Sequence, residues 1–300
     1  MPDPRLPTEE ELQDLMTKRR NWGRWGEDSD KGTVNLITPE KVVEAAGLVK
    51  KGRQISLSQV FPVKAGPGNE RPALHYTYTI DRGLRGEALD FYGTDYHTVS
   101  TTHVDALCHL WDQDGGWNGA DPDKMITTRG ATSGGIELWS EGIVTRCVFL
   151  NVPKYRGVPC VTPDNPVLNW ELDEIVDQLG VEVGSGDAVV VYSGRGAAGG
   201  YTTEGSRPGL GASCNKFLRD RDIAVLAWDM HDAFPNEYGN RDHTPHCALF
   251  AFGIVLLDSC LLEPLAQACE EEGRYEFMLT AAPLNVVGGT GSPLNPIAIF

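Results

Sequence analysis

The chain has 300 residues, and 41% of them are hydrophobic, which is enough apolar surface to build a substantial core. Its 42 acidic and 26 basic side chains give a formal net charge of −16, which repels both the phosphate backbone of nucleic acids and an anionic membrane surface. We therefore expect a globular protein that binds neither nucleic acid nor membrane.

The cysteines and the amino terminus indicate the compartment. Seven cysteines form no C-x-x-C pair, and several lie in apolar runs, as Cys147 does in residues 146–150, which is typical of buried free thiols in a reducing compartment. Residues 1–7 contain no apolar segment of a signal peptide, and the chain nowhere has about 18 consecutive apolar residues. We expect a cytoplasmic protein.

Two helices are predicted near the amino terminus. Thr8 and Glu11 fit the capping-box pattern, and the apolar residues that follow predict a short amphipathic helix ending near residues 21–23. Thr38 and Pro39 supply an N-cap and a first-turn proline for a second helix.

The domain organisation is expected to be simple. We predict an N-terminal arm over residues 1–37 and one domain over residues 38–300, because no repeat, low-complexity tract or break in composition divides the chain further. The arm carries Trp22 and Trp25 among charged residues, so it could pack on a neighbouring subunit.

Strands and helices then alternate along the chain. Alternating apolar and polar residues predict strands at 55–60 and 75–80, each with one face buried, and short β-branched runs predict central strands at 144–152, 188–192 and 223–228. Helical spacing is found at residues 170–179, 214–219 and 258–273. The pattern predicts an α/β chain with a mixed sheet.

The segment from Thr101 to His109 gathers two imidazoles and a carboxylate in a chain with only seven histidines. In an extended segment, side chains at i and i+2 point to the same face, so His103 and Asp105 can converge on one point, and His109 can reach back from a following turn. A buried carboxylate needs a compensating cation or donor. We therefore predict a site for Zn²⁺ or Mn²⁺, with a nearby histidine placed to move protons.

A second group lies at His243 and His246, which precede an apolar stretch that ends at Asp258. Taken alone, this group is weak evidence for a metal site, because an aspartate at the start of a helix, as Asp258 is expected to be, is most often an N-cap.

The chain resembles the cyclase or kynurenine formamidase-like family of metal-dependent hydrolases, whose signature reads H-x-G-T-H-x-D-x-P-x-H. Residues 102–105 and His109 fall on the T-H-x-D and the final H of that signature. Val99 stands in place of the first His, Thr101 in place of the Gly and Leu107 in place of the Pro. If the segment is a strand, His97 lies on the same face as Val99, and we expect it to substitute for the missing ligand.

The resemblance extends beyond this signature. The family has a second histidine that is followed twelve residues later by a glutamate, and His246 and Asp258 match this spacing with Asp in place of Glu. Residues 24–26, 32–36 and 288–296 also resemble segments of the longer branch of the family, so that the likeness spans nearly the whole chain.

The resemblance implies a fold, a ligand set and an assembly. It implies a single α/β domain of the swivelling β/β/α kind, with a metal held by His103 and Asp105 together with His97. Asp105 would bridge to a second ion held by His246 and Asp258, and His109 would act as the acid/base. It also favours a homodimer or a homotetramer.

Other residues are weaker candidates for binding a substrate. Trp111 and Trp117 flank a Gly-rich loop and could wall a pocket for a flat molecule, although a hydrophobic clamp is an equally good interpretation. Arg195 could bind a carboxylate or form a structural ion pair. His231 follows a predicted strand end, and His243 lies close to the second metal motif.

One motif is rejected. Residues 194–199 imitate the dinucleotide-binding pattern G-x-G-x-x-G, but no acidic residue follows in a convincing βαβ context.

These features predict a metal-dependent hydrolase that uses activated water to open an amide, formamide, lactam or lactone bond of a small, ring-bearing substrate. Two alternatives stay open. One is a metal-dependent cyclase, dehydratase or isomerase that stabilises an enolate, and the other is a non-catalytic binding protein that has lost its metal.

Overall fold

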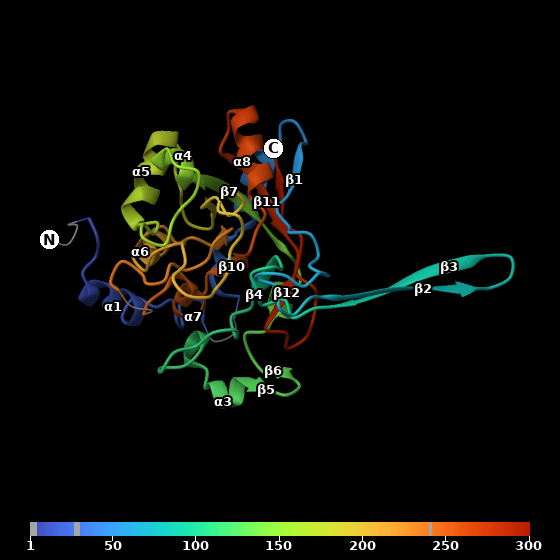
Figure 1. Ribbon diagram of the computed structural model, residues 1–300. Coiled ribbons are helices and arrows are strands. Elements are labelled where there is room, and N and C mark those ends of the chain that lie inside the picture. The colour runs from blue at the N-terminus through green and yellow to red at the C-terminus, as the bar shows by residue number, and fades with distance from the viewer. Residues whose placement is uncertain (1–4, 27–30, 240–241) are drawn as a thin grey trace.

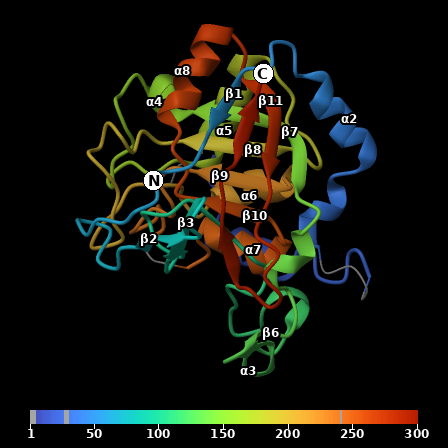
Figure 2. The same ribbon diagram turned by 90° about the vertical axis from the view of Figure 1, so that its right-hand side faces the viewer.

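A nine-stranded mixed sheet forms the centre of the computed structural model, which describes residues 5–26, 31–239 and 242–300 (Figures 1 and 2). β7 to β10 run parallel in the middle of the sheet, and the neighbours on both sides are antiparallel. In spatial order the strands are β1 (Gln54–Ser56), β13 (Ile297–Ile299), β11 (Glu276–Ala281), β7 (Ile143–Asn151), β8 (Ala188–Tyr192), β9 (Val225–Trp228), β10 (Val255–Asp258), β4 (His103–Asp105) and β12 (Gly291–Pro293).

The helices pack around this sheet. α5 packs against α6, and both lie with α7 to the left of the strands in Figure 1, while α2 packs against β7 and β11. The helices are α1 (Glu9–Thr17), α2 (Pro39–Gly47), α3 (Pro122–Met125), α4 (Val152–Arg156), α5 (Asn169–Leu179), α6 (Cys214–Asp220), α7 (Ala248–Phe252) and α8 (Glu263–Glu272). The alternation confirms the predicted α/β fold with a mixed sheet.

Most of the predicted elements are present. The Thr8 capping box opens α1, and Thr38 caps α2. The β-branched runs form the central strands β7, β8 and β9, in which nearly every residue is buried. The seven cysteines are free thiols, and five of them are buried. None of the helices in the described part of the chain has the length and apolar character that crossing a membrane requires.

Three predicted boundaries differ from the structure. α1 ends at Thr17, earlier than predicted, and β1 (Gln54–Ser56) includes only the first two residues of the strand predicted at 55–60. Asp258 ends β10 instead of opening a helix, because α8 begins only at Glu263, with Pro264 in its first turn.

Two small hairpins lie outside the main sheet. Within the described residues, β2 (Leu74–Asp81) pairs only with β3 (Gly86–Gly93), and β5 (Ile126–Thr127) pairs only with β6 (Gly130–Ala131). Figure 1 shows the β2–β3 hairpin projecting far from the rest of the molecule. The strand at 75–80 was expected to have a buried face, but every residue of β2 is exposed or half-buried in the single chain.

Part of the arm predicted over residues 1–37 packs on the core of its own chain. Leu12 and Leu15 belong to the main hydrophobic core. Nε1 of Trp22 donates to the carbonyl oxygen of Phe250 at 2.6 Å, and the ring of Trp25 lies 6.2 Å from that of Trp117. Residues 1–4 and 27–30 of the predicted arm lie outside the described residues.

Candidate metal centre

The sheet brings the two histidine motifs together. β10 pairs with β4 in antiparallel register, so that Asp258 lies opposite His103. β9 is the parallel neighbour of β10 on its other side, and His231 follows the end of β9. His103 and Asp105 are two residues apart in β4, so their side chains share one face. Segments that are far apart in the sequence therefore meet where these three neighbouring strands end on the same side of the sheet.

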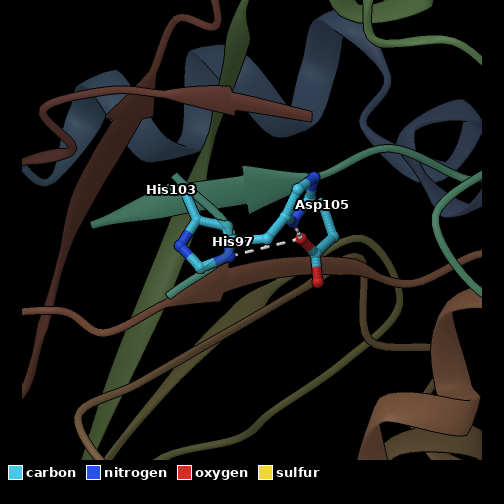
Figure 3. Close-up of side chains that lie close together, drawn as sticks. All are labelled: His97, His103 and Asp105. Atoms are coloured by element: carbon cyan, nitrogen blue, oxygen red, sulfur yellow. Dashed lines mark ion pairs between the residues drawn. The ribbon is translucent and has the colours of Figure 1, made fainter. Parts of the chain in front are cut away.

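The first triad consists of His97, His103 and Asp105, whose ligand atoms all lie within 4.8 Å of one another (Figure 3). Nδ1 of His97 lies 2.8 Å from Oδ1 of Asp105, and Nε2 of His103 lies 3.4 Å from the same oxygen. Two imidazole nitrogens and a carboxylate oxygen at this spacing are a suitable ligand set for Zn²⁺ or Mn²⁺.

The second triad consists of His231, His246 and Asp258, and its ligand atoms also lie within 4.8 Å of one another. Nε2 of His246 is 3.0 Å and Nε2 of His231 is 3.7 Å from Oδ2 of Asp258. Nε2 of His103 is 3.9 Å from the same oxygen, so the two triads adjoin. The sequence assigned His231 to substrate binding, whereas the structure brings it among the possible ligands.

Every imidazole of the triads has a second polar partner. Nδ1 of His103 faces the carbonyl oxygen of Thr101, and Nδ1 of His246 faces the carboxylate of Asp232. In each ring this contact makes Nδ1 the donor nitrogen. Nε2 is then left to face a carboxylate of the triads, which is Asp105 for His103 and Asp258 for His246. The distances are 2.8 Å from His103 Nδ1 to Thr101 O, 2.7 Å from His246 Nδ1 to Asp232 Oδ2, 3.1 Å from His97 Nε2 to Thr290 Oγ1 and 3.0 Å from His231 Nε2 to Ser259 Oγ.

The carboxylate of Asp105 shows that the site suits a cation. The residue is only 1% exposed, and both of its oxygens are buried without a hydrogen bond. Nδ1 of His97 is close to Oδ1 but outside hydrogen-bonding geometry. An uncompensated buried carboxylate costs several kcal/mol of folding free energy, so this donor set fits a divalent metal.

Electrostatics distinguish the histidines. Burial lowers the pKa of His231 to about 4. Burial also acts to lower the pKa of His246, but the carboxylates of Asp232 and Asp258 outweigh it and raise that pKa well above its ordinary value. The surrounding imidazoles hold the pKa values of Asp105 and Asp258 below the ordinary range, although burial alone would raise them.

His109 lies beside the first triad and outside it. Its ring stacks on that of His97, with 3.9 Å between the centroids and 5° between the planes, and its Nε2 is 3.9 Å from Oδ2 of Asp105. Burial lowers the pKa of His109 to about 4, so its ring is neutral at pH 7. A neutral imidazole in this position can accept a proton from a molecule bound in the site.

Both triads and His109 line one cavity of about 280 Å³. Its other walls include residues 68–71 and 202–204, which are mostly polar and contribute Glu70, Arg71 and Glu204. An adjacent cavity of about 380 Å³ shares His231 and His246 with the first one and is lined by aromatic side chains at Trp111 and Phe250. The site therefore combines a polar chamber with an aromatic one.

The remaining predicted site residues divide into two groups. Trp111 lines the aromatic cavity, and its role in binding a substrate stays a prediction. The structure does not bring the other three to either cavity: Trp117 is buried in the core, Nε2 of His243 lies 2.7 Å from Gln13 on α1, and Arg195 donates to the carbonyl oxygen of Val99 at 2.5 Å. Arg195 therefore supports the backbone that leads to the first triad.

Sequence analysis missed three polar neighbours of the triads. Asp232 directly follows His231, and Ser259 directly follows Asp258, so their position beside candidate ligands was a usable signal. Thr290 gives no such signal, because only the pairing of β12 with β4 brings it to His97.

One sequence family and several solved structures are similar to the chain. The sequence profile of the cyclase family matches residues 55–233. A novel cyclase of known structure is 26% identical, with a TM-score of 0.78 over 94% of this chain and 99% of its own. No curated protein matches the chain.

More distant structures share the fold alone. Isatin hydrolase A from Labrenzia aggregata, bound to benzyl benzoate, is 17% identical, with a TM-score of 0.55 over 86% of this chain and 97% of its own. Isatin hydrolase A from Ralstonia solanacearum is 18% identical, with a TM-score of 0.54 over 87% and 97%.

Proposed function

Since the chain belongs to the cyclase family, we propose that it is a metal-dependent hydrolase that opens an amide, formamide, lactam or lactone bond of a small substrate. The observation that carries this proposal is the buried Asp105 carboxylate, which has no hydrogen bond and is surrounded by imidazoles. The second triad adjoins it in the same cavity. We propose that each triad holds one divalent ion, Zn²⁺ or Mn²⁺.

The residues have separate roles in this proposal. A divalent metal, when bound, supplies a water of lowered pKa and polarises the carbonyl oxygen of the substrate. His103 and His246 present Nε2 toward the carboxylates because Thr101 and Asp232 occupy Nδ1. These two ligands are thus preorganised by their hydrogen-bond partners.

His109 is the proposed acid/base. It is neutral at pH 7 because burial lowers its pKa to about 4, so it can accept a proton from the attacking water and then pass it to the leaving nitrogen or oxygen. Its stacking on His97 holds the ring in the cavity.

The substrate is proposed to be small and to carry a ring. The polar cavity holds the reacting bond, and the adjacent cavity with Trp111 and Phe250 takes a flat apolar group. The structurally similar isatin hydrolases are named for a cyclic amide, which supports this class of substrate.

Turnover in H₂¹⁸O tests the reaction. The metal-loaded protein is incubated with isatin, an aryl formamide and an aryl lactone, and the products are analysed by mass spectrometry. A hydrolase places ¹⁸O in the acid product. Turnover without label would contradict hydrolysis and favour enolate chemistry, and no turnover of any compound by a metal-loaded protein would favour a binding protein.

A variant of His109 tests the assignment of the acid/base. His109→Ala is expected to lower kcat by about 10² to 10⁴ while metal content stays unchanged. His243→Ala serves as the control, because that histidine contacts Gln13 and lines neither cavity. Unchanged kcat in His109→Ala would remove His109 from the mechanism.

A further inference from the structure

Arg207 is a cationic side chain beside the candidate metal centre that forms no ion pair with any described residue. Most of the described arginines of this acidic chain contact a carboxylate, as Arg71, which lines the polar cavity, contacts Asp95 at 2.6 Å. Nε of Arg207 donates to the carbonyl oxygen of Asp232 and Nη1 donates to that of Thr203, each at 3.1 Å. A guanidinium has five N–H donors, so within the described chain both donors of Nη2 are left for a ligand.

Backbone pairing fixes Arg207 beside the second triad. The amide of Arg207 donates to the carbonyl oxygen of Phe234 at 2.8 Å, and the amide of Leu210 donates to that of His231 at 2.9 Å. The guanidinium also lies over the ring of Phe234, with Cζ 5.8 Å from the centroid. The position of Arg207 relative to the candidate ligand His231 is therefore set by main-chain contacts.

The cavity of about 380 Å³ brings this guanidinium together with aromatic side chains. Arg207 lines it beside Phe250 and Trp111, and Trp111 is 48% exposed. The carboxylate of Asp232 also lines the cavity, but it lies 2.7 Å from Nδ1 of His246 and accepts from the His246 amide at 3.1 Å, so its charge is already compensated. A ring bound here would pack on the aromatic side chains, and a carboxylate on that ring would accept from the guanidinium.

We propose that Arg207 binds a carboxylate group of the substrate, so that the substrate class is ring-bearing carboxylates rather than neutral rings. This inference rests on the proposed hydrolase function and names the substrate class of the same site. A chain of net charge −16 repels anions over most of its surface, so an anionic substrate needs a local cation of this kind. With the carboxylate on Arg207 and the ring against Trp111, the part of the cavity at His231 and His246 is left for the reacting bond.

Arg207 also lines another cavity, of about 440 Å³, which residues 160–163 and 198–202 help to form. No residue of either triad lines that cavity, and Tyr201 is the one aromatic side chain among the described residues around it. A carboxylate bound there would need no ring and would lie away from the candidate ligands. A small anion without a ring therefore distinguishes the two cavities.

Calorimetric titration of the metal-loaded protein with benzoate and with acetophenone tests the proposal. The two probes have nearly the same shape, and only benzoate is charged. We expect the wild type to bind benzoate about 10- to 100-fold more tightly than acetophenone, and Arg207→Met to lose this preference, because the charge-assisted hydrogen bonds to the guanidinium are removed. Arg207→Lys keeps the charge without the planar fork and should keep part of the preference.

Arg71→Met is the matched control. Arg71 lines the polar cavity and pairs with Asp95, so this variant should keep the wild-type preference for benzoate. Acetate carries the carboxylate without the ring and should bind at least about tenfold more weakly than benzoate. Equal affinities for acetate and benzoate would place the anion away from the aromatic side chains and would contradict the proposal.

Three further outcomes would overturn it. They are a wild type that binds benzoate no more tightly than acetophenone, a full preference for benzoate in Arg207→Met, and an equal loss of affinity for both probes in that variant. The last outcome is expected if Arg207 serves only to hold the backbone at Thr203 and Asp232.

The binding measurement is separate from the test of hydrolysis, because neither probe contains a bond that hydrolysis opens. Turnover of neutral isatin with ¹⁸O in the product, but without a preference for benzoate, would keep the proposed function and reject the role of Arg207. A preference for benzoate that is lost in Arg207→Met, without hydrolysis of any compound, would support the carboxylate site and contradict the hydrolase.

Discussion

The side chain of His97 reaches the first triad from a turn rather than from a strand. The amide of Thr101 donates to the carbonyl oxygen of Thr98, and this bend directs Val99 toward Tyr201 and Met230 while His97 faces Asp105. His97 therefore lies close to Asp105 because of a turn, and not because it shares a strand face with Val99. That His97 substitutes for the signature histidine stays a prediction.

Metal content tests this role at the scale of one residue. We expect His97→Ala and His103→Ala each to lower the metal bound per chain, because each removes one imidazole from a set of three ligands. His243→Ala is the matched control and should leave metal content at the wild-type value. Elemental analysis after dialysis against a weak chelator makes the comparison, and full retention of metal in His97→Ala would exclude that residue as a ligand.

Proton release tests the electrostatics of the second triad. The carboxylates of Asp232 and Asp258 raise the pKa of His246, so the metal-free protein holds a proton on this imidazole to a higher pH than an ordinary histidine does, and a metal must displace that proton. Affinity at this triad should therefore rise about tenfold per pH unit until the pH passes the raised pKa. Asp232→Asn removes one of the two carboxylates that raise that pKa, so calorimetric titration at pH 7 should show fewer protons released than for the wild type.

Ser259→Ala is the control for this titration. It removes the hydroxyl partner of His231 and leaves the carboxylates beside His246 in place. Ser259→Ala should release as many protons on metal binding as the wild type does. If Asp232→Asn also releases as many protons as the wild type, a raised pKa of His246 is contradicted.

At the scale of the element, the joint between α7 and β10 sets the distance between His246 and Asp258. Gly253 forms this joint with φ of 73°, and a Cβ there would lie 2.8 Å from the ring of Trp117 and 2.9 Å from Cα of Gly32. Burial of Trp117 thus has a structural purpose, which is to fill the space against the turn that leads into β10.

A pair of glycine variants isolates this contact. Gly273 at the end of α8 also has positive φ, of 60°, but no atom lies within 4 Å of its Cβ position. Gly273→Ala should lower the free energy of unfolding by about 1–2 kcal/mol from backbone strain alone. Gly253→Ala should cost a further ~1–3 kcal/mol from overpacking, and equal losses in denaturant titrations would contradict the role given to the joint.

The elements that sequence analysis predicted well are those with a local cause. The capping box at Thr8, the proline at position 39 and the β-branched run of β8 each act within a few residues, and each forms the expected element. The exposure of β2 could not be predicted from the sequence. Alternating apolar and polar residues indicate that one face of a strand is suited to burial, but they do not show which surface covers that face.

At the scale of the whole molecule, the site depends on contacts that no local pattern encodes. The signature around His103 pointed to a metal from spacing alone, and the resemblance added His246 and Asp258. Only the pairing of β10 with β4 shows that the two groups adjoin, and only the end of β9 brings His231 to them. Trp117 lies in the core for the same reason, since its packing against Trp25 and Gly253 is long-range.

The most direct test of the metal centre is anomalous X-ray diffraction from crystals grown with Zn²⁺ or Mn²⁺ and measured at the absorption edge of the metal. The account predicts one peak about 2.0–2.2 Å from the ligand atoms of His97, His103 and Asp105, and a second peak at the same distance from those of His231, His246 and Asp258. A metal-replete crystal without a peak in this cavity, or with its metal bound elsewhere, would contradict it.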